Sequence, residues 1–155
     1  TVMVTGPFMA EEQRKALRDL ARERGVQIRT SVGDSLSHLN AADLVVSMAG
    51  YNTMSEILRF RKRAIIVPRT APRMEQYIRA ARAQELGLVS MLLDDKQRDP
   101  YTMATALRQL PQQQLPSHVV VPGLLDGDIN INRLADQLLA RGRQDALRVA
   151  SRRAR

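Results

Sequence analysis

The chain has 155 residues, of which 24 are Lys or Arg and 16 are Asp or Glu, so its formal net charge is +8. The length suits one domain with a sizeable core, and the lack of cysteine excludes disulfides and cysteine-ligated metals. Aromatic residues make up only 3%, which argues against the stacking surfaces of single-strand nucleic-acid binders, and no recognition-helix or zinc-finger pattern occurs. The basic charge leaves open a phosphorylated ligand or an anionic surface, although a solvated basic face explains scattered arginines equally simply.

The first third of the chain alternates strand and helix patterns. A strand is predicted over residues 1–6, a helix over 10–24 that stops at Gly25, and a second strand over 26–30. Asp34 or Ser35 then begins a short helix that should turn Leu36 and Leu39 inward.

The rest of the chain continues the same alternation. Further strands are predicted at 44–46, 63–67 and 88–92, and helices at 53–58, 74–86 and 100–110. An irregular connection over 111–122 leads to a final amphipathic helix over 128–147. Strands that alternate with helices predict an α/β fold with a doubly wound parallel sheet and helices on both faces.

The most informative stretch is 42–58, which reads as a strand buried on both faces, a glycine turn and a helix. Gly50 would let the backbone turn sharply and approach a ligand closely. Free N–H groups in the first turn of the helix, helped by the helix dipole, favour an anion such as a phosphate. The alternative is a capping box, in which Thr53 caps the helix and Glu56 bonds back to it.

The segments that follow residue 58 repeat the order of strand, loop and helix. A strand ending in Val67-Pro68 leads through the loop 69–73 to a helix that carries Glu75-Gln76 and closes on Gly87. In this order and spacing, residues 26–92 resemble the C-terminal, donor-binding domain of family 28 glycosyltransferases. The resemblance implies a Rossmann-like fold, the C-terminal half of a two-domain GT-B architecture, and a metal-independent, inverting transfer from a UDP-like nucleotide sugar.

The resemblance also implies a set of donor-binding residues. Gly50, Tyr51, Asn52 and Thr53 would form the phosphate turn. Glu56, one turn into the helix, would accept hydrogen bonds from both ribose hydroxyls.

Two further pairs complete the implied donor site. Glu75 and Gln76 stand where the family grips the sugar, although its N-acetylglucosamine enzyme has Gln at both places, which leaves the sugar open; a solvated helix start is the alternative. Ser31 and Val32 match the loop whose backbone contacts the base. No catalytic base, cofactor or metal site is expected in this chain, because the base comes from the acceptor domain in the family.

One departure concerns how much of the family's domain the chain carries. The family's domain opens with a strand and a Gly-rich loop, whereas strand 1–6 here matches its second strand. We therefore expect residues 1–155 to be a single donor-binding domain that is a fragment of a longer protein, inactive in transfer by itself. Unpaired strand edges would favour self-association of this fragment.

Two other functional classes stay open at this point. A sugar-nucleotide epimerase or hydrolase of the same architecture would share the nucleotide turn, and a non-enzymatic basic module would bind an anionic surface. The expected partner is a nucleotide-sugar donor, without nucleic acid, with peripheral contact to an anionic membrane left open. The expected location is cytoplasmic, at the inner face of the membrane if that contact exists.

Overall fold

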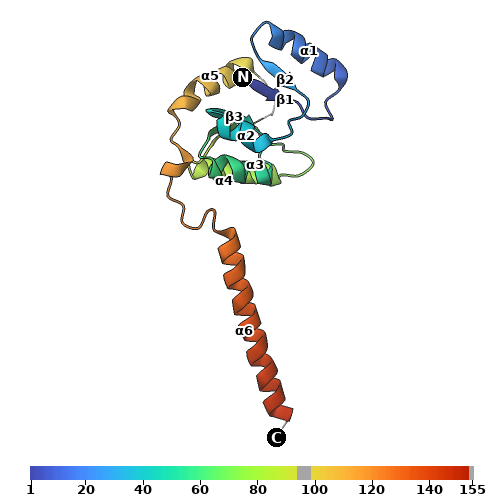
Figure 1. Ribbon diagram of the computed structural model, residues 1–155. Coiled ribbons are helices and arrows are strands. Elements are labelled where there is room, and N and C mark those ends of the chain that lie inside the picture. The colour runs from blue at the N-terminus through green and yellow to red at the C-terminus, as the bar shows by residue number, and fades with distance from the viewer. Residues whose placement is uncertain (94–98, 154–155) are drawn as a thin grey trace. The chain divides into compact units, whose positions relative to one another are not determined.

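The computed structural model describes residues 1–93 and 99–153, and the side chains of its last helix only as far as Arg143. The chain divides into two compact units, Thr1–Asp43 and Leu44–Arg155. Both are built from parallel strands joined by helices (Figure 1). The predicted Rossmann-like α/β class is confirmed.

The first unit holds a two-stranded parallel sheet. Strand β1 (Val2–Val4) pairs with β2 (Gln27–Arg29), and helix α1 (Glu11–Arg22) connects the two strands. Helix α2 (Ser35–Ala41) follows β2. Gly25 has a φ of +64°, a conformation that glycine adopts without strain, and it ends the α1 segment where the sequence predicts.

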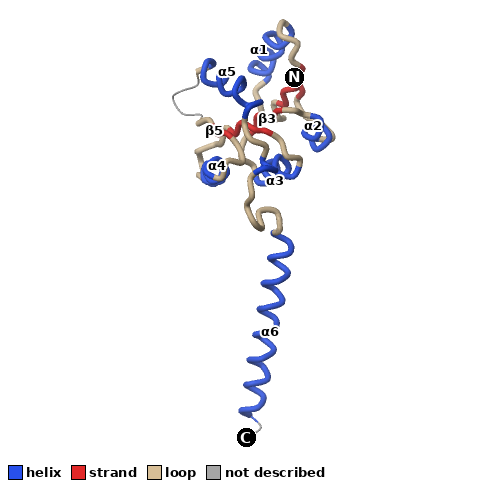
Figure 2. The backbone as a smooth tube through the Cα atoms, turned by 90° about the vertical axis from the view of Figure 1, so that its left-hand side faces the viewer, coloured by secondary structure: helices blue, strands red, loops and turns tan. Residues whose placement is uncertain are grey.

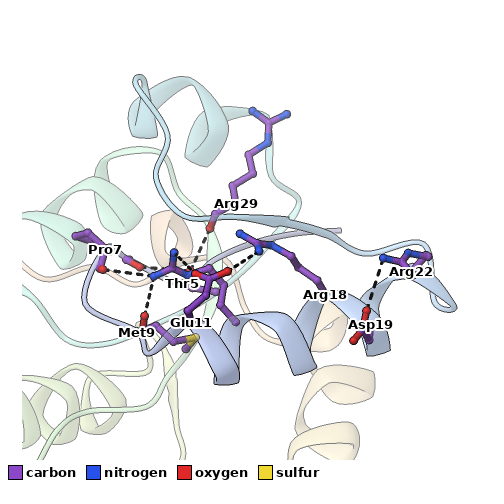
Figure 3. Close-up of polar contacts among 10 residues, drawn as sticks. Thr5, Pro7, Met9, Glu11, Arg18, Asp19, Arg22 and Arg29 are labelled. Carbon is purple, nitrogen blue, oxygen red and sulfur yellow. Dashed lines mark hydrogen bonds and ion pairs between the residues drawn. The ribbon is translucent and has the colours of Figure 1, made fainter.

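A cluster of charged side chains braces the turn between β1 and α1 (Figure 3). The largely buried Arg14 side chain donates to the carbonyl oxygen of Met9 at 2.7 Å and forms an ion pair with Glu11 at 2.9 Å. Glu11 also accepts from Arg18 at 2.9 Å. Since Glu11 lies in the first turn of α1, its charge also complements the helix dipole.

The second unit is organised around a three-stranded parallel sheet in the order β3-β4-β5. Its strands are β3 (Leu44–Ser47), β4 (Arg63–Ile66) and β5 (Ser90–Met91), joined by the helices α3 (Tyr51–Arg59) and α4 (Glu75–Glu85). Both helices lie on the same side of this sheet (Figure 2). Consecutive parallel strands connected in one direction by right-handed crossovers require this arrangement.

The core of the second unit is centred on β4. Ala64, Ile65 and Ile66 are fully buried, because β4 has a strand on each side. The helices cover it with small and apolar residues at helical spacing: Met54 and Ile57 from α3, and Ala80 and Ala83 from α4.

The chain after β5 is mostly helical. Helix α5 (Pro100–Gln109) begins with proline and is capped by the Asp99 carboxylate, as its sequence predicts for Pro100. Two 3₁₀ turns occupy Leu110–Gln112 and Pro116–His118 within the predicted irregular connection.

The last helix, α6 (Gly127–Arg153), runs past the predicted end of residue 147. Its predicted apolar stripe is exposed, with Ile131 and Leu138 each 67% accessible. No helix in the part of the chain that the structure describes is both long enough and apolar enough to cross a membrane.

Two predictions of burial are wrong. β3 was expected to be covered on both faces, yet Leu44 and Val46 are 36% and 48% exposed. Among the strands that the structure describes, β4 is the one that pairs with β3. Leu36 was expected to point inward but is 47% exposed, and α2 buries none of its residues. A two-stranded sheet offers little apolar surface for a second helix to cover.

Candidate donor-binding site

The start of α3 presents a row of backbone donors. The first hydrogen bond of the helix runs from the Met54 N–H to the Gly50 carbonyl oxygen at 2.9 Å, so the N–H groups of residues 51–53 precede it. Tyr51 and Asn52 are exposed, and the buried Met54 and Ile57 fix the helix to the sheet beneath. This turn can therefore bind an anion through three consecutive N–H groups at a helix N-terminus.

Gly50 occupies the N-cap without an unusual backbone conformation. Its φ of −60° and ψ of 144° are open to any residue, so the sharp turn inferred from the sequence is not what requires glycine. A Cβ at this position would meet only the Thr53 hydroxyl oxygen, at an ordinary 3.8 Å. What glycine contributes is the absence of a side chain at the entrance to the helix.

The capping-box alternative does not form. The helix begins at Tyr51, so Thr53 is its third residue and not its cap. The half-buried Glu56 carboxylate has no hydrogen bond or ion pair with any residue that the structure describes. Glu56 is thus available to a ligand, while its role toward ribose stays a prediction.

The predicted sugar-binding pair lies at the start of α4. Because β3 and β4 are parallel with Ser47 opposite Ile66, the loops that follow them emerge at the same edge of the sheet. Glu75 is exposed at the first position of α4. Gln76 is only 9% exposed, and its Oε1 accepts from the backbone N–H of Arg69 at 3.1 Å. Gln76 thus holds the loop before α4, whether or not its amide group also meets a sugar.

Arg79 is a residue of this edge that the sequence reasoning missed. From α4 its Nη1 donates to the carbonyl oxygen of Ala49, and its guanidinium carbon lies 5.6 Å from the centre of the Tyr51 ring. The two residues are 30 positions apart in sequence, and no local sequence pattern predicts their contact. Its one sequence signal is its place four residues after Glu75, on the same face of the helix.

The predicted base-contacting pair belongs to the first unit. Ser31 is exposed and Val32 half-buried in the loop after β2. Their contact with a base stays a prediction. In the described ranges, 1–93 and 99–153, no three acidic or histidine side chains gather as a metal-binding cluster.

Comparison with known proteins identifies the family of the chain. The model of the glycosyltransferase family 28 C-terminal domain matches residues 2–118, which is more than half of the chain and includes segments of both units. The chain belongs to this family. The resemblance inferred from the strand, turn and helix order is thereby confirmed.

Three bacterial relatives share the name UDP-N-acetylglucosamine--N-acetylmuramyl-(pentapeptide) pyrophosphoryl-undecaprenol N-acetylglucosamine transferase. The protein of Clostridium kluyveri is 33% identical over 82 residues, which are 51% of this chain and 23% of that protein. That of Geobacillus kaustophilus is 34% identical over 79 residues, 49% of this chain and 22% of its own. That of Fusobacterium nucleatum is 41% identical over 66 residues, which are 43% of this chain and 18% of that protein. The match spans less than a quarter of each relative.

Proposed function

We propose that this chain is the donor-binding part of a two-domain glycosyltransferase that uses a UDP-like nucleotide sugar. Membership of family 28 and the row of free N–H groups at the start of α3 support the proposal. The relatives' printed names include a UDP-sugar donor. The observation that carries it furthest is the α3 turn, with an unengaged Glu56 carboxylate one turn further along the helix.

The chemistry required of this part of the enzyme is stabilisation of a leaving group. When the sugar leaves, negative charge develops on the nucleoside diphosphate, and preorganised donors lower the barrier most where that charge appears. The N–H groups of residues 51–53 are held by the helix and need no reorganisation. On this proposal they serve in place of a metal ion, and transfer proceeds with inversion through a base supplied by an acceptor domain outside residues 1–155.

The remaining residues of the predicted site take supporting roles in this proposal. Glu56 binds the ribose hydroxyls, and Ser31 and Val32 meet the base. Glu75 and the amide group of Gln76 meet the sugar. The exposed position of Glu75 and the unpaired state of Glu56 within the described chain are compatible with these roles.

The deciding experiment compares Glu56→Ala with the unsubstituted protein in binding UDP. Loss of a charged hydrogen-bond partner costs about 1.5–3 kcal/mol, which weakens UDP by roughly tenfold to a hundredfold. Isothermal titration calorimetry gives the dissociation constants. We expect the unsubstituted protein to bind 2′-deoxy-UDP more weakly than UDP. Glu56→Ala should bind the two nucleotides with the same affinity.

Glu85→Ala is the matched control, because Glu85 is an exposed carboxylate at the far end of α4 that forms an ion pair with Arg82 at 3.0 Å. It should leave UDP binding unchanged. A protein that binds neither UDP nor a UDP-sugar contradicts the proposed function. Equal binding of UDP by Glu56→Ala removes Glu56 from the site.

We also propose that the parent enzyme meets its acceptor at an anionic membrane surface. The relatives' names contain a lipid, undecaprenol, and the chain's net charge of +8 favours anionic headgroups. Cosedimentation with vesicles of anionic lipid should exceed cosedimentation with neutral vesicles and fall with salt. Equal recovery with both vesicle types contradicts this proposal.

A further inference from the structure

The Arg79 guanidinium lies against the residues on either side of the α3 N-cap. It donates to the carbonyl of Ala49, which is fully buried, and it lies over the ring of Tyr51, the first residue of the helix. These two contacts hold the guanidinium at the anion-binding end of α3. The half-buried side chain thus has two local contacts that position it at this turn.

The charge on Arg79 is not matched by a carboxylate. No ion pair engages it within the part of the chain that the structure describes. A guanidinium carries five N–H donors, and one hydrogen bond, to Ala49, is formed there. Among the described side chains, the buried polar atom without a hydrogen-bond partner is Arg14 Nε. The nitrogen atoms of Arg79 that form no hydrogen bond there are therefore open to solvent or to a ligand.

The position of this charge is electrostatically unfavourable without an anion. The N-terminus of a helix carries the equivalent of a partial positive charge, and a cation beside it is destabilising. An anion bound at the same turn reverses the sign of both interactions. A diphosphate also matches a planar fork of donors better than it matches a point charge.

We propose that Arg79 is a diphosphate-binding residue of the donor site, acting together with the N–H groups of residues 51–53. This inference rests on the proposed function, since it adds a contact to the same site. Because Arg79 projects from α4 one turn after Gln76, it also links the helix of the sugar-binding pair to the turn that binds the phosphates.

The test measures UDP and uridine binding to the chain and to its variants Arg79→Gln and Arg79→Lys, by calorimetry and by NMR titration. Removing the charge should weaken UDP by about tenfold to a hundredfold and leave uridine, which has no phosphate, unchanged. Arg79→Lys, which keeps the charge but not the fork, should lose less. The salt dependence of UDP binding should also become shallower in Arg79→Gln.

Arg82→Gln is the matched control, because it removes the same charge from an exposed position of the same helix. It should change UDP binding by less than about twofold, as long-range charges at the surface are screened. Equal UDP binding by Arg79→Gln and the unsubstituted chain overturns this inference alone. Equal losses for UDP and uridine overturn it too, because they indicate that Arg79 only maintains the local fold. A chain that binds no UDP before substitution refutes the proposed function instead.

Discussion

Strands β1 and β4 each contain three consecutive apolar residues and differ in burial. Both are short and parallel to their neighbours. Val2, Met3 and Val4 are 45%, 43% and 48% exposed, whereas Ala64, Ile65 and Ile66 are fully buried. β4 lies between β3 and β5 and is covered by two helices, whereas β1 pairs with β2 and with no other strand in the described residues. An apolar run in the sequence therefore shows that a strand can be buried. Whether the strand is buried depends on how many strands and helices lie beside it.

The sharpest way to break this comparison is to truncate one side chain in each strand. Ile65→Ala leaves a cavity in a fully buried site and should lower the free energy of unfolding by about 2–5 kcal/mol. Val4→Ala removes half-exposed atoms and should change it by no more than about 0.5 kcal/mol. Urea denaturation followed by circular dichroism measures both. Similar losses would mean that β1 is buried in solution and would remove the contrast between the two strands.

The self-association that the sequence predicts offers the second test, because the exposed edge of β1 would be one source of it and the exposed α6 stripe another. Val4→Lys places a charge on the edge strand and should shift the weight-average mass toward the monomer. Leu138→Lys places the same charge on α6, where the native side chain is 67% exposed. Sedimentation equilibrium at several concentrations distinguishes them. We expect the larger effect from Val4→Lys, and a reversed order would assign the association to α6.

The smallest expected effect is at the α2 cap of the first unit. The Asp34 carboxylate accepts from the Ser37 hydroxyl and, at 2.9 Å, from the Ser37 N–H, and these bonds lower its pKa below the usual 3.8. Because the folded pKa is the lower one, the bonds stabilise α2 above pH 3.8, and their contribution is lost as the pH falls through the folded value.

An NMR titration should therefore place the midpoint of Asp34 below that of Asp34 in a peptide of the same sequence. Asp34→Ala should reduce the helix content of α2 slightly at neutral pH, whereas Asp34→Asn, which keeps an acceptor, should reduce it less. Asp19→Ala on α1 is the control, since Asp19 has only an exposed ion pair to Arg22. A midpoint equal to that of the peptide would show that the cap does not persist in solution.

Local sequence determined the order of elements well. Gly25 and Gly87 have positive φ where the chain was expected to leave a helix, Asp34 caps α2, and Pro100 begins α5. These signals act through the backbone of a few neighbouring residues. Chain order and spacing were also enough to identify the family.

What failed depends on contacts between distant segments. The burial of Val46 and Leu36 depends on which elements lie beside them, and neither residue's neighbours in sequence carry that information. The contact of Arg79, one turn into α4, with Ala49, in the loop before α3, likewise has no local signal. Gly50 shows the opposite failure, because the sharp backbone turn expected there does not need glycine: its φ and ψ are open to any residue.

The hydrogen bond from the Arg69 N–H to Gln76 Oε1 restricts what substitutions at position 76 can reveal. With its oxygen already engaged by the loop, the side chain can present to a sugar only its NH₂ group, which is a donor. A change to a hydrophobic residue would loosen the loop and remove the donor together, so a loss of activity would not identify the cause. Gln76→Glu keeps the acceptor and exchanges the donor for a charge, and for this reason it is the substitution that separates the architecture of the loop from recognition of the sugar.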